Sequence, residues 1–248
     1  EIIRNMISSK QVIPERGTVI AIPIMNVFGF IMNERGVPDG KDINRSFPGA
    51  KEGSLARMLA YTLMHHIVPI VDCGIDFHTG GASRANYPQI RCSFNLPEAR
   101  ELAKAFASPV ILHSTLIKKS FRMAANRKNT PIIVYEGGES LRLNDTAIDE
   151  GIAGTLRVMK YLKMISNAQD AAYSKMYRKS VWLRAKRSGI FNPSLELGTL
   201  VSKKETLGVR PNVQTELYRL VNVFVLSKEQ PMEFRRFTVG HLLHTNFN

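Results

Sequence analysis

Between residues 71 and 164, short apolar segments alternate with longer segments that have the periodicity of helices. The apolar segments cover residues 71–78, 89–94, 109–112 and 131–135, and their length and β-branched content are typical of buried strands. Helices are expected over 97–106, which has Pro97 near its start, and over 145–164, where apolar residues recur at helical spacing. Strands that alternate with helices predict an α/β domain with a largely parallel sheet.

The N-terminal part has three features of its own. Residues 18–24 are apolar and β-branched, and we predict a buried strand there. Residues 27–53 are rich in Gly, Pro, Asn and Asp, which predicts a long loop, and long loops in compact domains tend to be functional. Ser54 is expected to cap a helix that runs to about Ile67.

The pattern changes after about residue 167. Short β-rich segments at 181–191, 198–201, 218–226 and 237–243 are separated by Gly, Pro and Asn. We therefore predict two domains, a larger α/β domain over residues 1–170 and a small all-β domain over residues 175–248.

The formal net charge of +13 at pH 7 is high for a chain of 248 residues. Nucleic-acid binding is one explanation, because the segment 175–187 concentrates Lys and Arg around Tyr177 and Trp182. The other basic residues are scattered, so we prefer a solvated surface near the domain junction to a nucleic-acid site. Part of the charge would also attract anionic substrates to a cleft. No apolar run is long enough to span a membrane.

The two cysteines, Cys73 and Cys92, do not form a CxxC pair and are too few for a disulfide framework. Both lie in apolar, strand-like segments, where buried and unreactive thiols are expected. This cysteine usage favours a reducing, cytoplasmic setting.

His78 and Glu136 each stand at the end of an apolar segment. In parallel sheets the working residues gather at the carboxyl ends of strands, so we expect these two side chains to meet in one cleft. Asp76 lies two positions before His78, on the same face of a strand, where it can orient the imidazole of a metal-ligating histidine. Glu136 precedes Gly137 and Gly138 and is placed to act as a general base. The alternatives are a strand-end histidine satisfied by a turn and a helix-capping or salt-bridged glutamate.

The long loop carries Arg35 and the adjacent pair Asn44 and Arg45. An arginine offers two parallel hydrogen bonds to a carboxylate and an asparagine adds a further donor, so the pair is suited to bind a substrate carboxylate. The alternative is an ordinary surface loop.

These motifs occur in series along the chain. They are MNVFGF with the following Arg35, PDGKDINRSFPG, GIDFHTGG, the YPQIR stretch and IVYEGGE. Over residues 1–165 the series resembles the succinylglutamate desuccinylase/aspartoacylase family, a branch of the carboxypeptidase A-like zinc hydrolases. The resemblance implies a carboxypeptidase-like mixed, largely parallel sheet flanked by helices. The β-rich tail is similar to the small barrel-sandwich-like domain, related to biotinyl and lipoyl folds, of many bacterial members.

The resemblance also implies roles for the candidate residues. His78 is implied as a ligand of one Zn²⁺ ion with Asp76 beside it, and the partner His and Glu of an HxxE motif are expected upstream of residue 1. Glu136 is implied as the catalytic carboxylate, and Arg35 as the group that polarises the scissile carbonyl. Substrate binding is implied for Asn44, Arg45 and Arg91.

The implied function is zinc-dependent hydrolysis of the amide bond of a small N-acyl amino acid or related amine. Such an enzyme is a metal-dependent amidohydrolase that acts on carbon–nitrogen bonds other than peptide bonds. Its partner would be a small carboxylate-bearing substrate rather than a membrane or a nucleic acid, and a homo-oligomer is left open. A zinc carboxypeptidase or peptide amidase is the alternative with the same chemistry. A metal-free relative that binds a ligand or nucleic acid through its basic surface is the alternative from another class.

Overall fold

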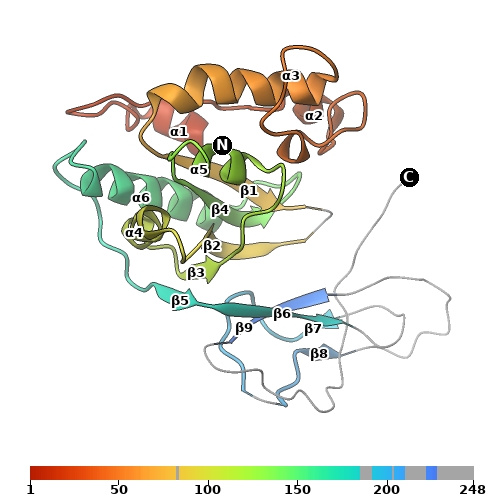
Figure 1. Cartoon of the computed structure of the whole chain (residues 1–248). Coiled ribbons are helices and arrows are strands. Elements are labelled where there is room, and N and C mark those ends of the chain that lie inside the picture. Colours follow the sequence, from red (N-terminus) through yellow and green to blue (C-terminus); the bar gives the residue numbers. More distant parts are fainter. Residues whose placement is uncertain (82–83, 185–191, 203, 210–221, 228–248) are drawn as a thin grey trace.

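Among the described residues, the main sheet has five strands. The computed structural model describes residues 1–81, 84–184, 192–202, 204–209 and 222–227 (Figure 1). The strands are β1 (Gly74–Gly80), β2 (Asn86–Cys92), β3 (Val110–His113), β4 (Ile132–Glu139) and β5 (Lys175–Tyr177), in the order β1-β4-β2-β3-β5. β2 runs antiparallel to β4, and the other neighbouring pairs are parallel. The predicted mixed, largely parallel sheet is therefore confirmed, and it includes all four apolar segments between residues 71 and 135.

The helices pack on both faces of this sheet. On one face α4 (Pro97–Phe106) and α6 (Asp145–Tyr161) cover the strands, and α1 (Ile2–Ser8) packs on α6. On the other face lie α3 (Leu55–Thr62) and α5 (Phe121–Asn126). The Ser54 hydroxyl accepts from the Arg57 amide at the start of α3, as predicted, and a π-helical turn continues that helix to Ile67.

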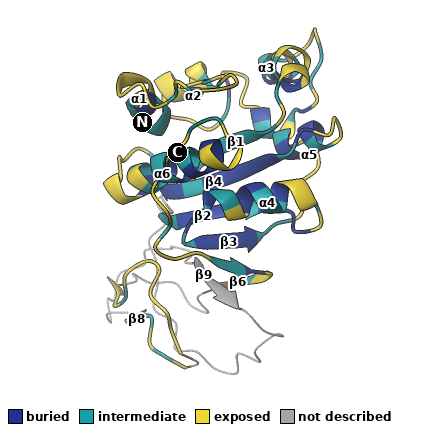
Figure 2. Cartoon of the chain, turned by 90° about the vertical axis from the view of Figure 1, so that its left-hand side faces the viewer, coloured by how far each residue is buried: buried dark blue, intermediate teal, exposed yellow. Residues whose placement is uncertain are grey.

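Strand β4 separates two hydrophobic clusters because its side chains alternate between the faces of the sheet. Ile133 and Tyr135 are buried against α4 and α6, whereas Ile132 belongs to the cluster formed with α3 and α5. The inner strands are buried along most of their length (Figure 2). Residues of β4 that share the face of Ile132, which include Val134 and Glu136, therefore point away from α4 and α6.

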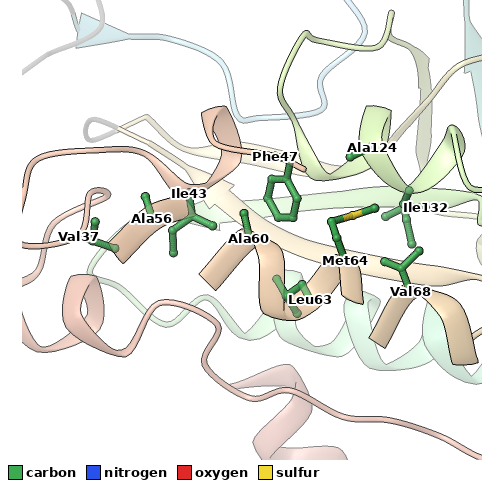
Figure 3. Packing of buried hydrophobic residues seen from close by; sticks show 11 residues of the cluster. Val37, Ile43, Phe47, Ala56, Ala60, Leu63, Met64, Val68, Ala124 and Ile132 are labelled. Carbon is green, nitrogen blue, oxygen red and sulfur yellow. The ribbon is translucent and has the colours of Figure 1, made fainter. Parts of the chain in front are cut away.

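The segment 27–53 was predicted as a long loop and contains two short helices, α2 (Val27–Met32) and the 3-10 turn η1 (Ile43–Arg45). The loop is anchored by buried Val37, Ile43 and Phe47, which belong to one cluster with the alanines of α3 and α5 (Figure 3). Since Ile43 and Phe47 flank Asn44 and Arg45, this packing fixes the backbone that carries the asparagine–arginine pair.

The strand predicted at residues 18–24 is wrong. In the described structure this segment is irregular, and Ile20, Ile22 and Ile24 are exposed. Pro23 has no backbone N–H to donate to a strand ladder, which weakens this segment as an inner strand. Residues 198–201 are not a strand either.

In the part of the C-terminal region that the structure describes, there are two small antiparallel pairs. β6 (Lys179–Arg184) pairs with β9 (Asn222–Ser227), and β7 (Asn192–Pro193) pairs with β8 (Gly208–Val209). β5 lies within the residues assigned to the small domain, but it pairs with β3 at the edge of the main sheet. The predicted segment 237–243 lies outside the described residues. In the described part of the chain, no helix has the length and apolar character needed to cross a membrane.

Candidate active site

Charged side chains gather on one face of the main sheet. Ile75 and Phe77 of β1 pack against the cluster under α4 and α6, so Asp76 and His78 lie on the opposite face. On β2, Ile90 and Cys92 belong to that same cluster, so Arg91 shares the face of Asp76 and His78. Three strands thus bring acids, an imidazole and a guanidinium to one side of the sheet.

The register places His78 directly beside Glu136, because the two residues are Cα partners in the parallel pair of β1 and β4. β2 approaches from the other side of β4 and runs in the opposite direction, so that Asn86 at its start pairs with Gly138. The end of β1 and the start of β2 therefore lie at the same edge of the sheet, on either side of Glu136.

A cavity of about 250 Å³ opens over this edge. Its lining includes every residue that the sequence singled out for the site: Arg35, Asn44, Arg45, Asp76, His78, Arg91 and Glu136. The structure therefore brings the loop and the three strands to one place. The individual roles given to these residues by the family resemblance stay predictions.

Glu136 lies between a hydrogen-bond donor and a guanidinium. Its Oε2 accepts a hydrogen bond of 2.6 Å from Asn86 Nδ2, and its Oε1 lies 3.3 Å from Arg91 Nε. The carboxylate is only 16% exposed, so these two contacts fix its position at the cavity wall. A carboxylate fixed in this way can present a lone pair to a bound water or amine.

His78 is bound to the carboxylate two residues before it. Its Nε2 lies 2.9 Å from Asp76 Oδ2, as the shared strand face predicted. Burial alone would lower the pKa of His78, but the charge and hydrogen bond of Asp76, together with the charge of Glu136, raise this pKa above its usual value. The imidazole is therefore oriented and made more basic by Asp76.

Asp42 organises the loop residues of the site. Its two carboxylate oxygens accept from the Asn44 amide at 2.8 Å and from Arg35 Nε at 2.9 Å. The side-chain oxygen of Asn44 accepts from the Phe121 amide at 2.9 Å, which leaves the Asn44 NH₂ group as a donor at the cavity. Arg45 donates from Nη1 to the Asn44 carbonyl at 2.6 Å. The loop is thus tied internally and to the start of α5.

Several lining residues were missed by the sequence reasoning, namely Arg84, Asn86, Ser114, Arg122 and Trp182. Asn86 begins an antiparallel strand, whereas the reasoning considered only the carboxyl ends of strands. Arg84 lies over the ring of Trp182, 5.7 Å from its centroid, so β6 contributes an aromatic wall. Arg122 lies on the six-residue helix α5, in a region where no helix was predicted.

A zinc site can be tested against these side chains. Catalytic zinc is commonly held by about three protein ligands. Among the residues that the structure describes, no group of three or more His, Cys, Asp or Glu side chains is placed to hold a metal ion. His78 alone offers an imidazole to the cavity, so the described residues do not make a complete zinc site by themselves.

The comparisons with known proteins agree with this fold. The model of the succinylglutamate desuccinylase/aspartoacylase catalytic domain matches residues 1–162. The chain therefore belongs to the succinylglutamate desuccinylase/aspartoacylase family, as its motifs predicted.

Two individual relatives each share 27% sequence identity with this chain. N-alpha-acetyl-L-2,4-diaminobutyric acid deacetylase of Halomonas elongata is 27% identical over 208 residues, which are 77% of this chain and 60% of the relative. The chain thus spans about three fifths of that relative's length. A solved succinylglutamate desuccinylase/aspartoacylase from Rhodobacter sphaeroides shares 27% identity at a TM-score of 0.73, over 90% of this chain and 72% of the other.

The product-bound ectoine utilization protein EutE (DoeB) from Ruegeria pomeroyi has a TM-score of 0.75 at 18% identity, over 89% of this chain and 71% of the other. At this identity the similarity concerns the fold alone. It supports the carboxypeptidase-like arrangement of sheet and flanking helices.

Proposed function

We propose that this chain hydrolyses the amide bond of a small N-acyl amino acid or a related amine. The observation that carries the proposal is the position of Glu136, which stands beside His78 and Arg91 at a cavity that Asn44 and Arg45 also line. Family membership and the deacetylase relative support the same reaction class. The enzyme would act on carbon–nitrogen bonds other than peptide bonds.

Substrate binding is assigned to the loop. The guanidinium of Arg45 and the free NH₂ group of Asn44 would hold the carboxylate of the substrate, and the internal ties of the loop keep both groups in position. Preorganised donors lose little freedom on binding, which favours both affinity and the correct orientation of the amide. Arg91, which lies beside Glu136, would also contribute to substrate binding.

The proton transfers are assigned to Glu136. In the proposed reaction its carboxylate takes a proton from the attacking water and later delivers it to the leaving amine. Arg35 would stabilise the negative charge that develops on the carbonyl oxygen. Because Asp42 holds Arg35 through Nε, the terminal nitrogens of this guanidinium are left as donors.

We also propose one Zn²⁺ as the cofactor, with His78 as one of its ligands. When bound, such an ion polarises a carbonyl and lowers the pKa of a bound water. The contact between His78 and Asp76 is the arrangement that commonly supports a ligating histidine. Since the described residues contain no group of three such ligands, the proton chemistry above is assigned to the chain's own groups.

Two variants of neighbouring carboxylates test the hydrolysis. Free amine would be measured after incubation with N-acetyl-L-2,4-diaminobutyrate and with a panel of N-acetyl and N-succinyl amino acids. Glu136→Gln should lower kcat by at least about 100-fold, because the proton acceptor is lost. Glu139→Gln is the matched control, since Glu139 lies on the same strand, pairs with Arg142 at 2.7 Å and does not line the cavity. Unchanged turnover in Glu136→Gln would reject the proposal.

Metal analysis tests the cofactor separately. We expect about one zinc per chain in the purified protein, and much less after His78→Ala. His66→Ala is the control, because His66 is exposed on the turn after α3 and lies away from the cavity. Equal zinc contents in the two variants would show that His78 is not a ligand.

A further inference from the structure

The start of β2 holds the carboxylate that we assign to proton transfer. Asn86 is the first residue of this strand and donates from Nδ2 to Glu136 Oε2 at 2.6 Å. Asn86 is also the Cα partner of Gly138, but the register between β2 and β4 shifts between Asn86 and Gln89. The regular ladder from Gln89 onward therefore does not by itself fix Asn86, and the contacts of the residues next to it decide its position.

Arg84 makes two contacts beside this strand start. Its Nε donates to the Gly81 carbonyl at 2.9 Å, and its guanidinium carbon lies 5.7 Å from the centroid of the Trp182 ring. A β-carbon at Gly80 would overlap the Arg84 carbonyl oxygen, so the end of β1 approaches Arg84 more closely than any residue other than glycine allows. Arg84 thus connects the end of β1, the start of β2 and the indole ring of β6.

The strand that carries this ring is anchored to the main sheet. Only Arg178 separates β6 from β5, and β5 pairs with β3 at the edge of the sheet (Figure 1). Trp182 lies within the antiparallel ladder of β6 and β9. Further along the C-terminal part, Gly198 lies so close to the ring of Tyr87 on β2 that a β-carbon there would overlap it. The C-terminal part therefore presents Arg84 with an aromatic ring whose backbone is fixed.

We propose that Arg84 and Trp182 are positioning residues, whose contact holds the start of β2 in place so that the Asn86 amide fixes Glu136. The inference rests on the proposed function for the reaction that Glu136 serves. The C-terminal part would then support turnover through a ring that takes no part in the proton transfers. The alternative is a wall, in which Trp182 acts only through its own contact with the ligand.

The size of the expected effect follows from the strength of the contact. A cation over an aromatic ring at an exposed position changes an equilibrium constant by about 2- to 5-fold, and the ring adds apolar contacts. Since misplacement of a catalytic group slows a reaction strongly, Trp182→Ala should lower kcat about 10-fold and change KM by less than about 2-fold. Trp182→Phe keeps an aromatic ring under Arg84 and should restore most of the loss. Arg84→Ala should resemble Trp182→Ala.

Combined variants separate positioning from a wall. If Trp182 acts through Asn86, the ring has no further effect once the amide is gone, so Asn86→Ala and Asn86→Ala/Trp182→Ala should have the same kcat. A wall would instead raise KM in both backgrounds, by a factor that differs between N-acetyl and N-succinyl substrates. Arg178→Ala is the matched control, because the Arg178 guanidinium lies 5.8 Å from the centroid of the Phe94 ring and does not line the cavity. It should leave kcat unchanged.

Hydrogen exchange followed by mass spectrometry tests the positioning without turnover. The segment 86–92 should exchange about 5-fold faster or more in Trp182→Ala and Arg84→Ala than in the wild type, whereas α4 at 97–106 should be unchanged. If Trp182→Ala does not fold, Arg84→Ala decides in the same way, because Arg84 is exposed.

Wild-type exchange over 86–92 would overturn the inference, and so would independent losses of kcat in the combined variant. Faster exchange over 97–106 as well would indicate general loosening and would equally count against it. The exchange is measured without substrate, so its result does not depend on hydrolysis. A failure of the proposed reaction, shown by Glu136→Gln, is therefore distinguishable from a failure of the positioning by Arg84 and Trp182.

Discussion

The two faces of the main sheet are built by the same strands but differ in what they contribute. Tyr135 and Glu136 are consecutive on β4. Tyr135 is buried under α4 and α6, packs near Phe77 and Phe106, and donates its hydroxyl to the Ala147 carbonyl at 2.6 Å. Glu136 faces the cavity with Asn86 and Arg91. The apolar face supplies stability. We infer that this stability offsets the free-energy cost of holding partly buried charged side chains in place on the opposite face.

The largest expected effect on stability comes from the apolar face. Tyr135→Ala should lower the free energy of unfolding by about 3–5 kcal/mol, because it removes a fully buried ring and leaves a cavity. Chemical denaturation measured by circular dichroism would give this value. In contrast, Glu136→Gln keeps the shape of the side chain, and we expect it to change the free energy of unfolding by less than about 1 kcal/mol. Comparable losses of unfolding free energy in the two variants would contradict the inferred difference between the two faces.

The sequence predicted this sheet well because its strands are apolar, short and bounded by polar turns. The same patterns placed His78 and Glu136 at strand ends, and parallel pairing then made them neighbours. Asn86 was missed because β2 is antiparallel, and strand direction cannot be read from a single apolar segment. The apolar segment 18–24 was assigned to a strand because periodicity alone does not show whether a partner strand is available.

Arg122 shows a second limit of sequence reasoning. Its helix has six residues, which is too short for a helical repeat to be recognised. An arginine in such a segment would ordinarily be taken for a surface residue. Only the packing of α5 against the loop and β4 buries it at the cavity, and that packing joins residues more than 70 positions apart, as in the contact of Asn44 with Phe121.

A smaller effect on stability is expected from a substitution at Ile43, which anchors the loop 27–53. Ile43 precedes Asn44 and is buried with Val37 and the alanines of α3 (Figure 3). Ile43→Ala should lower the free energy of unfolding by about 2–4 kcal/mol. It should also raise KM more than it lowers kcat, because the proposed carboxylate-binding pair would lose its support while Glu136 stays in place.

The control for this variant lies in the same loop. Ile31 on α2 is 71% exposed, so Ile31→Ala should leave both stability and KM close to the wild type. If Ile43→Ala destabilised the protein and left KM unchanged, the loop would not position the substrate-binding pair.

The smallest effect is expected for the reactivity of the two thiols. Their labelling rates report how readily the apolar face under α4 and α6 opens to solvent. Cys92 has no exposed surface, and its neighbour Arg91 lies on the charged face. Burial raises the pKa of Cys92 to about 12, against the opposing charges of Arg122 and Arg100. Since the thiolate is the reactive form and a raised pKa disfavours it, Cys92 should not react with a disulfide reagent at pH 8 in the folded protein.

Cys73 provides the comparison within the same chain. It precedes β1, is partly exposed, and has a pKa that burial also raises. We expect slow labelling of Cys73 in the native protein, and labelling of Cys92 only on unfolding. Cys73→Ser should then remove the native signal and leave one thiol that appears with denaturant. Rapid native labelling of Cys92 would mean that the face under α4 and α6 opens readily, and the rigid support inferred for Glu136 would lose its basis.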